Sequence, residues 1–561
     1  MLVKLSIICK ENKDMKEIKF INARVMDPIQ NKNNVLETIF INSEGKIENI
    51  SSSDGYDVIN CCNSIMMSGG IDLHTHIGGG KTNIARMLMP EGLCKSNGFE
   101  YGNKGESVPG TIDTGYRYAE MGYTAAFEPA MIFSNARQAH LEMGDVPILD
   151  HGAYVMLGND EIFLEMLAKK KGHSLIRDYV GWSINASKAM GVKVVNPGGI
   201  SAFKFNQRSL DLDEKHSHWG LTPRNIVHEL ALSLQELGVP HPLHIHASNL
   251  GVPGNIKSTI ETIDALEGIR GHLTHVQFHC YGSEGPKKFS SASLQLAEKL
   301  KSSKNISIDV GQIIFGQTVT TSGDTMKQHS NRNNANPKKW VMGDIECTAG
   351  CGVVPFKYKE NSFVNALQWV IGLEIFLLVD DPWQVVLTTD HPNGGPFTSY
   401  PHLIKLLMNK EFRDEQLHQL HPDVVEHCIL KDIKKELSLY EIAIMTRAAP
   451  AKILGLVDNG SLAKGMHADI VVYKEDADQE YMFSTPEYVF KNGKLVVRNG
   501  KLVGCPKPGL HYLNISFDGG VENYLKKYFE ENCVGQFRNG FITEGEIDLF
   551  LDGGKKILRK I

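Results

Sequence analysis

The stretch that decides the fold is IMMSGGIDLHTH at residues 65–76, a short apolar run that ends in His74 and His76. Such a run beside glycines is typical of a strand buried in a sheet. In a strand, residues i and i+2 point to the same side, so the two histidines share one face and can hold one metal ion. An HxH pair alone is weak support for a metal site, so the rest of the chain has to decide.

Seven more short apolar runs follow, separated by helical stretches. This alternation predicts parallel strands joined by crossover helices, and eight strands are the number that a (β/α)8 barrel of the TIM type needs. The further runs lie at 123–129, 148–157, 191–197, 242–248, 273–279, 306–313 and 385–391. The polar stretches rich in Gly and Asn are expected to be long loops on the active-site face, at 78–115, 200–220 and 315–340.

Two local signals support the helices between the strands. Thr222 followed by Pro223 is a helix start with an N-cap and proline in the first turn. Ser438 and Glu441 have the spacing of a capping box.

The two ends of the chain have a different texture, with short alternating strands and tight turns. Asn492-Gly493 and Asn499-Gly500 are hairpin turn signals within 487–504. We expect residues 1–65 and 456–510 to form one composite β-sandwich domain, because pairing covers the exposed edges of both segments. Residues 66–455 then form the α/β catalytic barrel, and 511–561 a C-terminal extension without an assigned role.

Composition excludes several classes of protein. The 561 residues carry 59 Lys+Arg against 65 Asp+Glu, a net charge of −6, and no basic block that would attract nucleic acid or an anionic membrane. The 10 cysteines are scattered without a CxxC pair, which argues against a disulfide framework or an iron–sulfur site. With no signal-peptide core and no long uncharged apolar stretch, we expect a cytoplasmic location.

Histidines and one aspartate recur where the predicted strands end. In a barrel the carboxyl ends of the strands face one cavity, so these side chains can converge although they are far apart in sequence. Imidazoles with a carboxylate are the ligand set of zinc or a similar ion in an open catalytic site. The groups at the strand ends are His74, His76, His244, His246, His275, His279, Asp390 and His391.

GGIDLHTH after a short β-rich segment, a pair of downstream histidine segments and the aspartate of LTTD resemble the amidohydrolase superfamily of metal-dependent hydrolases. In its binuclear branch a lysine becomes N6-carboxylysine and bridges two metal ions. The modification suits this task, because a carboxylate can span two cations that an ammonium would repel. Lys193 in GVKVVNPGG is the preferred candidate, and Lys204 in ISAFKFNQ is its rival.

A denser set of motifs narrows the resemblance. HTHIGGGKTNIARMLMPE, YRYAEMGYTAAFEPAM, HIHASNLGVPGN, THVQFHCYG and LTTDHPNGGPFTSYP are similar to the hydrolytic subunits of formylmethanofuran dehydrogenases and of formyltransferase/hydrolase complexes. The resemblance implies two Zn²⁺ ions and cleavage of the N-formyl group of a methanofuran- or methylofuran-type carrier to formate and free amine. The metal ligands carried over by motif are His74, His76, Lys193, His246, His275 and Asp390. HASN matches the ligand-bearing HAEN of hydantoinases, which favours His246 over His244.

The resemblance also implies roles and partners. Asp390 is expected to move the proton between the attacking water and the leaving amine, since an alkylamide nitrogen leaves poorly unless it is protonated. Asn249, His279 and Asn393 are candidate substrate contacts. A hetero-oligomeric complex with a formyltransferase is implied. Three alternatives stay open: formate condensation by a formylmethanofuran dehydrogenase, a cyclic amidase of the dihydropyrimidinase or hydantoinase kind, and a scaffold that has lost its metals.

Overall fold

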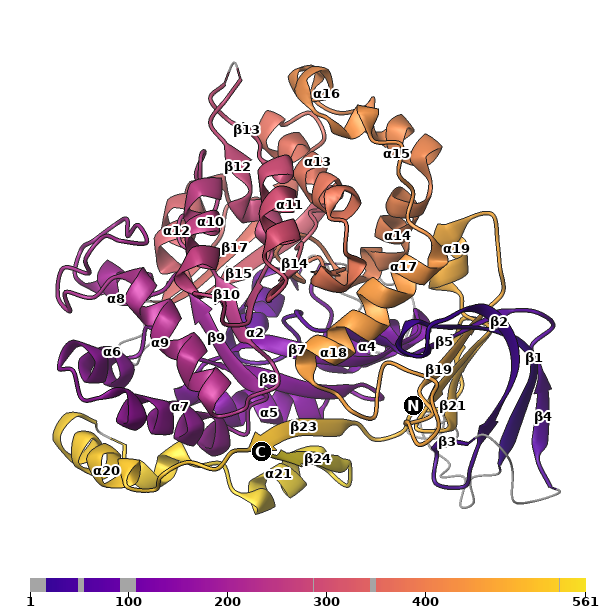
Figure 1. Cartoon of the computed structure of the whole chain (residues 1–561), viewed down its shortest axis with the longest axis horizontal. Helices are drawn as coiled ribbons and strands as arrows, with labels where there is room; N and C mark the ends of the chain where they lie inside the picture. The colour runs from indigo at the N-terminus through magenta and orange to yellow at the C-terminus, as the bar shows by residue number, and fades with distance from the viewer. Residues whose placement is uncertain (1–16, 49–54, 91–106, 286, 344–349, 534) are drawn as a thin grey trace.

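A parallel barrel forms the centre of the molecule (Figure 1). The computed structural model describes residues 17–48, 55–90, 107–285, 287–343, 350–533 and 535–561. No helix among these residues is long and apolar enough to cross a membrane.

The barrel strands are short, each pairs in parallel with the next, and together they confirm the predicted count of eight. The first and last strands approach where Thr75 forms an isolated parallel bridge with His391. In order around the barrel the strands are β6 (Gly70–Asp72), β7 (Tyr123–Met131), β8 (Asp150–Met156), β9 (Gly191–Val195), β10 (Leu243–His246), β11 (Gly271–Leu273), β14 (Ile306–Asp309) and β18 (Val385–Val386).

Helices cover the outside of the barrel. The N-cap of Thr222 and the capping box of Ser438 with Glu441 are both present, as the sequence predicts. The main helices are α4 (Thr111–Glu120), α5 (Ala136–Gly144), α6 (Glu161–Ala168), α7 (His173–Ser187), α9 (Pro223–Glu236), α10 (Ile256–Ala265), α11 (Ser293–Ser302), α13 (Phe363–Leu378), α14 (Tyr400–Met408), α15 (Lys410–Leu417), α16 (Pro422–His427), α17 (Leu439–Ala443) and α18 (Ala449–Leu454).

The stretch 65–76 is two strands in two sheets, so the prediction of one continuous strand is wrong. β5 (Ile65–Ser68) belongs to the outer sheet and β6 to the barrel. Between them the chain passes so close to β7 that a Cβ on Gly69 would lie 2.1 Å from Thr124 Oγ1. Only glycine fits here, and the GG pair therefore marks the junction between the sheets.

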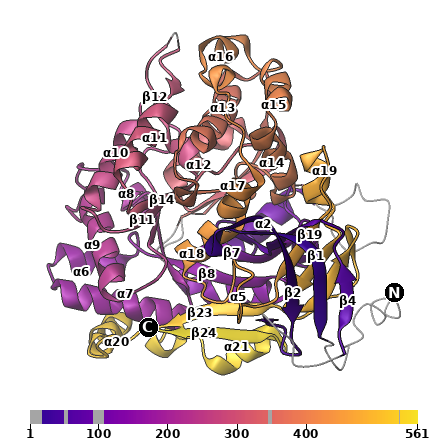
Figure 2. The ribbon, with the colours of Figure 1, turned by 45° about the vertical axis from the view of Figure 1, so that its right-hand side comes forward.

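The outer sheet combines strands from both ends of the chain, as Figure 2 shows. β5 pairs with β1 on one side and with β19 on the other. Its own apolar core includes Phe20 and Phe490, whose rings meet edge to face at 5.2 Å. The strands are β1 (Ile18–Asp27), β2 (Lys32–Ile41), β3 (Ile47–Glu48), β4 (Asp57–Asn60), β5, β19 (Ile470–Tyr473), β20 (Tyr488–Lys491), β21 (Lys494–Arg498) and β22 (Lys501–Leu502).

The predicted hairpin turns join β20 to β21 and β21 to β22. Asn492, Gly493, Asn499 and Gly500 all have positive φ angles, which this type of two-residue turn requires.

The stretch 315–340 is not a loop, contrary to the sequence-based expectation. It contains β15 (Gly316–Ser322) and α12 (Thr325–Asn331), and β15 pairs with β17 (Cys351–Tyr358) over seven residue pairs. β16 (Val341–Gly343) completes this small antiparallel sheet. The sequence GQTVTTS alternates weakly and has few large apolar side chains, so its strand character was hidden.

The other two predicted loops are partly helical. α2 (Gly80–Leu88) and α8 (Gly199–Lys204) lie within or at the edge of 78–115 and 200–220, and part of the first stretch falls outside the described residues.

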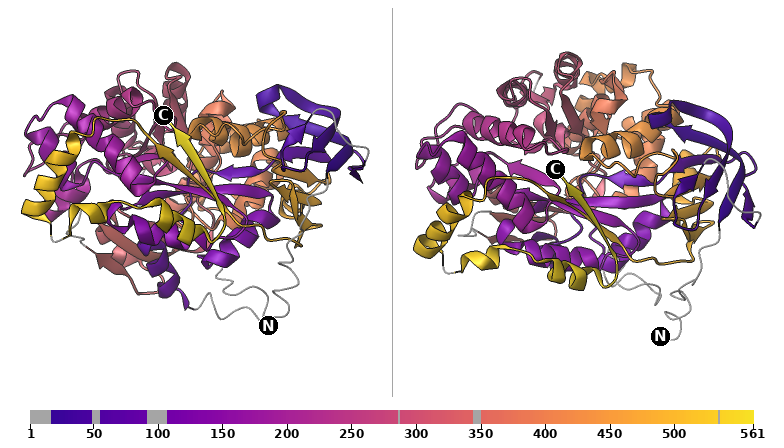
Figure 3. Two further views of the ribbon diagram at one scale, coloured as in Figure 1. Left: turned by 90° about the horizontal axis from the view of Figure 1, so that it is seen from below. Right: turned by 60° about the horizontal axis from the view of Figure 1, so that its bottom comes forward.

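The C-terminal extension packs against the barrel. β23 (Gly509–Asn514) pairs in parallel with β24 (Lys555–Lys560) and touches β8 through Leu510 and His151. Figure 3 shows these strands crossing the underside of the barrel, with the C-terminus beside them. α20 (Val521–Asn532) and α21 (Glu544–Leu551) complete the extension, with α19 (Gln479–Ser484) in the chain before it.

Candidate active site

A polar cavity of about 990 Å³ opens at the carboxyl ends of the barrel strands. Five of the six predicted metal ligands line it, namely His76, Lys193, His246, His275 and Asp390. The sixth, His74, lies directly behind them and is fully buried. Residues from β15, α12 and β17 form the opposite wall, so the small antiparallel sheet is part of the site.

His74 and His76 meet at Asp390. His74 Nε2 lies 2.9 Å from Asp390 Oδ1, and His76 Nε2 lies 3.4 Å from the same oxygen. Both histidines follow the end of β6, yet they reach one point from the same side, as the i, i+2 pattern predicts. Burial acts to raise the pKa of Asp390, but the neighbouring imidazoles outweigh it and hold that pKa well below its usual range. The carboxylate is therefore ionised and able to bind a cation.

Lys193 lies inside the cavity, in the middle of β9. Its Nζ is 3.4 Å from His74 Nε2, and the residue is 2% exposed. Burial lowers the pKa of Lys193 to about 8. A lysine with a lowered pKa presents a larger share of neutral amine, which is the form that reacts with CO2. Lys204, its rival, lies on α8 away from the cavity, 3.9 Å from Glu161.

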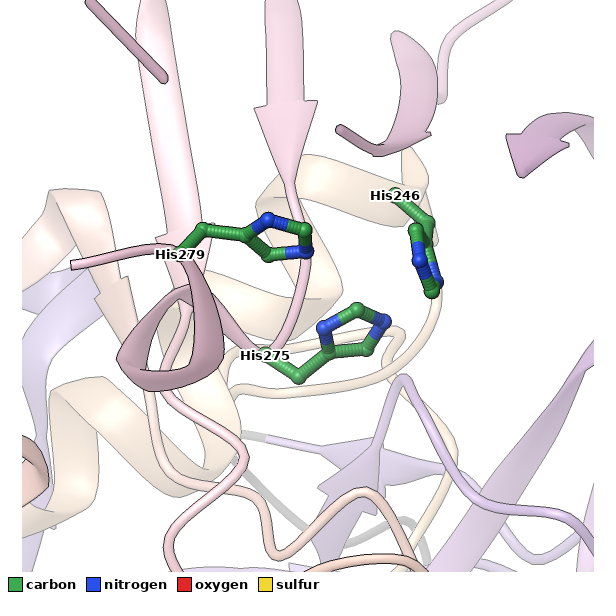
Figure 4. A group of neighbouring side chains, drawn as sticks. All are labelled: His246, His275 and His279. Carbon is green, nitrogen blue, oxygen red and sulfur yellow. The ribbon is translucent and has the colours of Figure 1, made fainter. Parts of the chain in front are cut away.

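Three imidazoles gather on the other side of the cavity (Figure 4). His246, His275 and His279 each offer a ring nitrogen within 4.8 Å of those of the others. Burial lowers the pKa of all three, so they are neutral and have a lone pair for a metal. His275 Nδ1 is buried without a hydrogen-bond partner among the described residues. Buried nitrogens without partners fit the donor set of a metal site.

The backbone at the end of β11 differs from the predicted strand 273–279. β11 ends at Leu273, His275 has a φ of 38°, and residues 276–279 form a short 3-10 turn. A Cβ on Gly311 would lie 2.4 Å from His275 Cβ, so glycine is required where the next strand ends. His275 thus reaches the cavity from a turn rather than from a strand.

His244 is excluded from the cavity by its own hydrogen bonds. Its Nε2 lies 2.9 Å from His74 Nδ1, and its Nδ1 lies 3.1 Å from His241 Nε2. It precedes His246 by two residues on β10 and therefore lies deeper, in the polar interior of the barrel. This arrangement agrees with the choice of His246 at the cavity.

Buried carboxylates behind the histidines were missed by the sequence analysis. Glu128 Oε1 lies 2.9 Å from His76 Nδ1, and Asp309 Oδ2 lies 3.2 Å from His74 Nδ1. Such contacts orient the ring and set which nitrogen is free to bind a metal. Each of these acids is a single charge inside an otherwise apolar strand, FEP in β7 and ISID in β14, and that signal could have identified them.

The three candidate substrate contacts are placed differently. Asn393 lines the cavity and donates from Nδ2 to Asp390 Oδ1 at 2.9 Å. His279 belongs to the imidazole group described above but is not part of the cavity wall. Asn249 lies outside the wall, and its Nδ2 donates to Asp211 at 2.6 Å and to Ser258 at 3.0 Å.

The glycine-rich segment 78–80 is occupied by the protein itself. The backbone N–H groups of Ile77 and Gly78 donate to Glu128, and that of Gly79 donates to Glu142. At the other glycine pair, a Cβ on Gly394 would lie 2.5 Å from the Thr389 carbonyl oxygen. The second pair therefore allows close backbone packing beside Asp390, whereas the first forms a turn held by two carboxylates.

Comparisons with known proteins agree with this site and fold. The model of the amidohydrolase family matches residues 57–503. A component of the formyltransferase/hydrolase complex Fhc from Methylorubrum extorquens, its A component, is 40% identical over 519 residues, which cover 91% of this chain and 93% of the relative. Protein FwdA from Methanocaldococcus jannaschii is 39% identical over 476 residues, which cover 82% of this chain and 83% of FwdA.

A solved structure extends the match to three dimensions. A chain in the crystal structure of the FhcABCD complex from Methylorubrum extorquens, determined with methylofuran, superposes with a TM-score of 0.92 at 37% identity. The superposition covers 97% of this chain and 99% of that one. The chain described here therefore belongs to the amidohydrolase family, in the branch that contains the A component of Fhc and FwdA.

Proposed function

We propose that this chain is a binuclear zinc hydrolase that cleaves the N-formyl group of a formylmethanofuran- or formylmethylofuran-type carrier to formate and free amine. The observation that carries the proposal is the convergence of His74, His76, His246, His275, Lys193 and Asp390 on one cavity from strands spread over the barrel. The 40% identity to the A component of Fhc over 91% of the chain supports the choice of substrate class.

The two sides of the cavity match the two halves of a binuclear site. His74, His76 and Asp390 would hold one metal ion, His246 and His275 the other, and a carboxylated Lys193 would bridge them. Two ions held in this way would lower the pKa of a water toward neutrality and polarise the formyl carbonyl.

The residues of the chain supply the remaining steps of a formamide hydrolysis. Asp390 is ionised at neutral pH and can accept the proton of the attacking water. It then returns this proton to the departing amine nitrogen. Asn393 holds Asp390 Oδ1 through its side-chain amide and so limits the rotation of the carboxylate.

The chain is proposed to act in a cytoplasmic hetero-oligomeric complex that includes a formyltransferase. This part of the proposal rests on the relative, which is one component of a formyltransferase/hydrolase complex. A formyltransferase would produce the N-formyl carrier that the hydrolase consumes.

Incubation of the purified protein with N-formylated methylofuran or N-formyl-aminomethylfuran tests the substrate, with dihydrouracil as the competing cyclic amide. We expect release of formate from the formylated amines and no ring opening of dihydrouracil. Ring-opened product without formate would overturn the proposal in favour of a cyclic amidase.

A further inference from the structure

Asp324 is a buried carboxylate at the cavity that comes from outside the barrel. It lies between β15 and α12, in the small antiparallel sheet layer, and its side chain is 1% exposed. Its Oδ2 lies 3.4 Å from His246 Nε2, and neither atom has another hydrogen-bond partner among the residues described. The two groups therefore depend on each other.

The two oxygens of Asp324 have different tasks. Oδ1 accepts from Asn196 Nδ2 at 3.2 Å and from the backbone N–H of Lys327 at 3.3 Å, the second being the N-cap contact of α12. These contacts fix the carboxylate and leave Oδ2 turned to His246. A carboxylate held in place can orient an imidazole at little entropic cost.

The same pairing recurs at the other side of the site. His76 Nδ1 faces Glu128 while its Nε2 faces Asp390, and His74 Nδ1 faces Asp309 while its Nε2 faces Asp390. In both cases one ring nitrogen meets a buried acid and the opposite one meets the cavity. At His246 the nitrogens are exchanged, because the acid meets Nε2.

We propose that Asp324 is a positioning residue that accepts the Nε2 proton of His246 and so commits Nδ1 of that imidazole to the metal. The inference rests on the proposed function. It gives the layer formed by β15, α12 and β17 a task beyond closing the cavity, since this layer would carry one acid of the metal centre. Asn196, which follows β9, then connects Asp324 to the strand that bears Lys193.

Competition with a zinc chelator tests the proposal on the full chain. Asp324→Asn keeps the size and the N-cap acceptor but removes the charge. We expect one of the two zinc ions to bind about 10- to 100-fold more weakly, on the scale of such outer contacts, while the other is unchanged. Asp160→Asn is the matched control, because Asp160 is a buried N-cap, of α6, that does not line the cavity.

Equal zinc affinity in wild type and Asp324→Asn would overturn the proposal. A crystal structure of the zinc-loaded wild type provides an independent check. Zinc on His246 Nδ1 with Asp324 at Nε2 supports the proposal, whereas zinc on Nε2 or on Asp324 itself overturns it. Formate release is measured in parallel on wild type: two bound zinc ions without formate release would refute the proposed function and leave the inference about Asp324 standing.

Discussion

At the scale of single residues, Asp390 has two tasks that a substitution can separate. Its carboxylate meets both His74 and His76, and its backbone has a φ of 50°. Asparagine tolerates this left-handed conformation, so Asp390→Asn should leave the turn intact. We expect turnover to fall at least about 100-fold, the usual contribution of a general acid–base group. Steady-state formate release measures it, and Asp381→Asn, at the cap of the 3-10 turn before β18, is the control.

Zinc content measured on the same samples separates the loss of a proton carrier from the loss of a metal ligand. Near-normal turnover in Asp390→Asn with unchanged metal content would remove Asp390 as the proton carrier.

Lys193 is tested by its loss and by chemical replacement. Lys193→Ala should lower the metal content, because it removes the bridging carboxylate, and short carboxylic acids should partly restore both metal and activity. Zinc per chain, measured with and without added propionate, reports the effect.

Lys204→Ala is the matched control, since Lys204 lies on α8 outside the cavity. If it loses metal and responds to propionate while Lys193→Ala does not, the bridging lysine has been assigned to the wrong position.

Much of the candidate site could be predicted from residue types and strand ends. The histidines and Asp390 were identifiable because ligands at the carboxyl ends of barrel strands converge. Asp324 and Glu128 could not be ranked, because single acids are common and only the three-dimensional structure shows which imidazole each one faces. Asn249 was misleading for the same reason, since its amide is engaged by Asp211 and Ser258.

At the scale of elements, the junction between β5 and β6 is the point of least tolerance. A Cβ on Gly69 would overlap Thr124, whose Oγ1 would be 2.1 Å away. Gly69→Ala should cost about 1–3 kcal/mol of unfolding free energy, the usual range for overpacking. Thermal unfolding measures it, and Gly55→Ala is the control, since a Cβ there would meet nothing within 4 Å.

The double variant Gly69→Ala/Thr124→Ala should recover part of this loss, because it removes the overlapping atoms. Equal stability of Gly69→Ala and wild type would contradict the close approach of the two strands.

The elements most easily predicted were those with strong local signals. Hairpins with Asn-Gly turns and capped helices were found with correct boundaries to within a few residues, because their turn chemistry is local. The layer β15–β17 was missed because its partners are distant in sequence, as Thr320 opposite Val354 illustrates, and its strands bury few large side chains. Sheet pairing at that separation leaves little trace in a single sequence.

At the scale of the whole molecule, a buried ion cluster joins the barrel, the outer sheet and the C-terminal extension. Lys491 Nζ lies 2.6 Å from Asp150 and 2.7 Å from Asp469, and the N–H of Gly509 donates to Asp150. Removing the cation leaves two buried carboxylates uncompensated. Lys491→Met should therefore cost about 3–5 kcal/mol at pH 7, whereas Lys494→Met, on the exposed end of β21, should cost little.

The pH dependence of this cost has a defined sign. Burial acts to raise the pKa of Asp150, but the Lys491 ammonium outweighs it and holds the pKa well below its usual range. This stabilisation is present above the unfolded pKa of about 4 and is lost as the pH falls below it. The stability difference between wild type and Lys491→Met should shrink on acidification, as measured by urea unfolding at several pH values. A difference that grows on acidification would contradict the assigned cluster.

The central claim is that this molecule is a metal-dependent hydrolase of an N-formyl amine. Formate release from N-formyl-aminomethylfuran, followed before chelation, after chelation and after zinc is returned, tests it most directly. We predict formate and free amine in equal amounts, loss of release on chelation and recovery with about two zinc ions per chain. Formate release that persists in metal-free protein, or none from zinc-replete protein, would contradict the account.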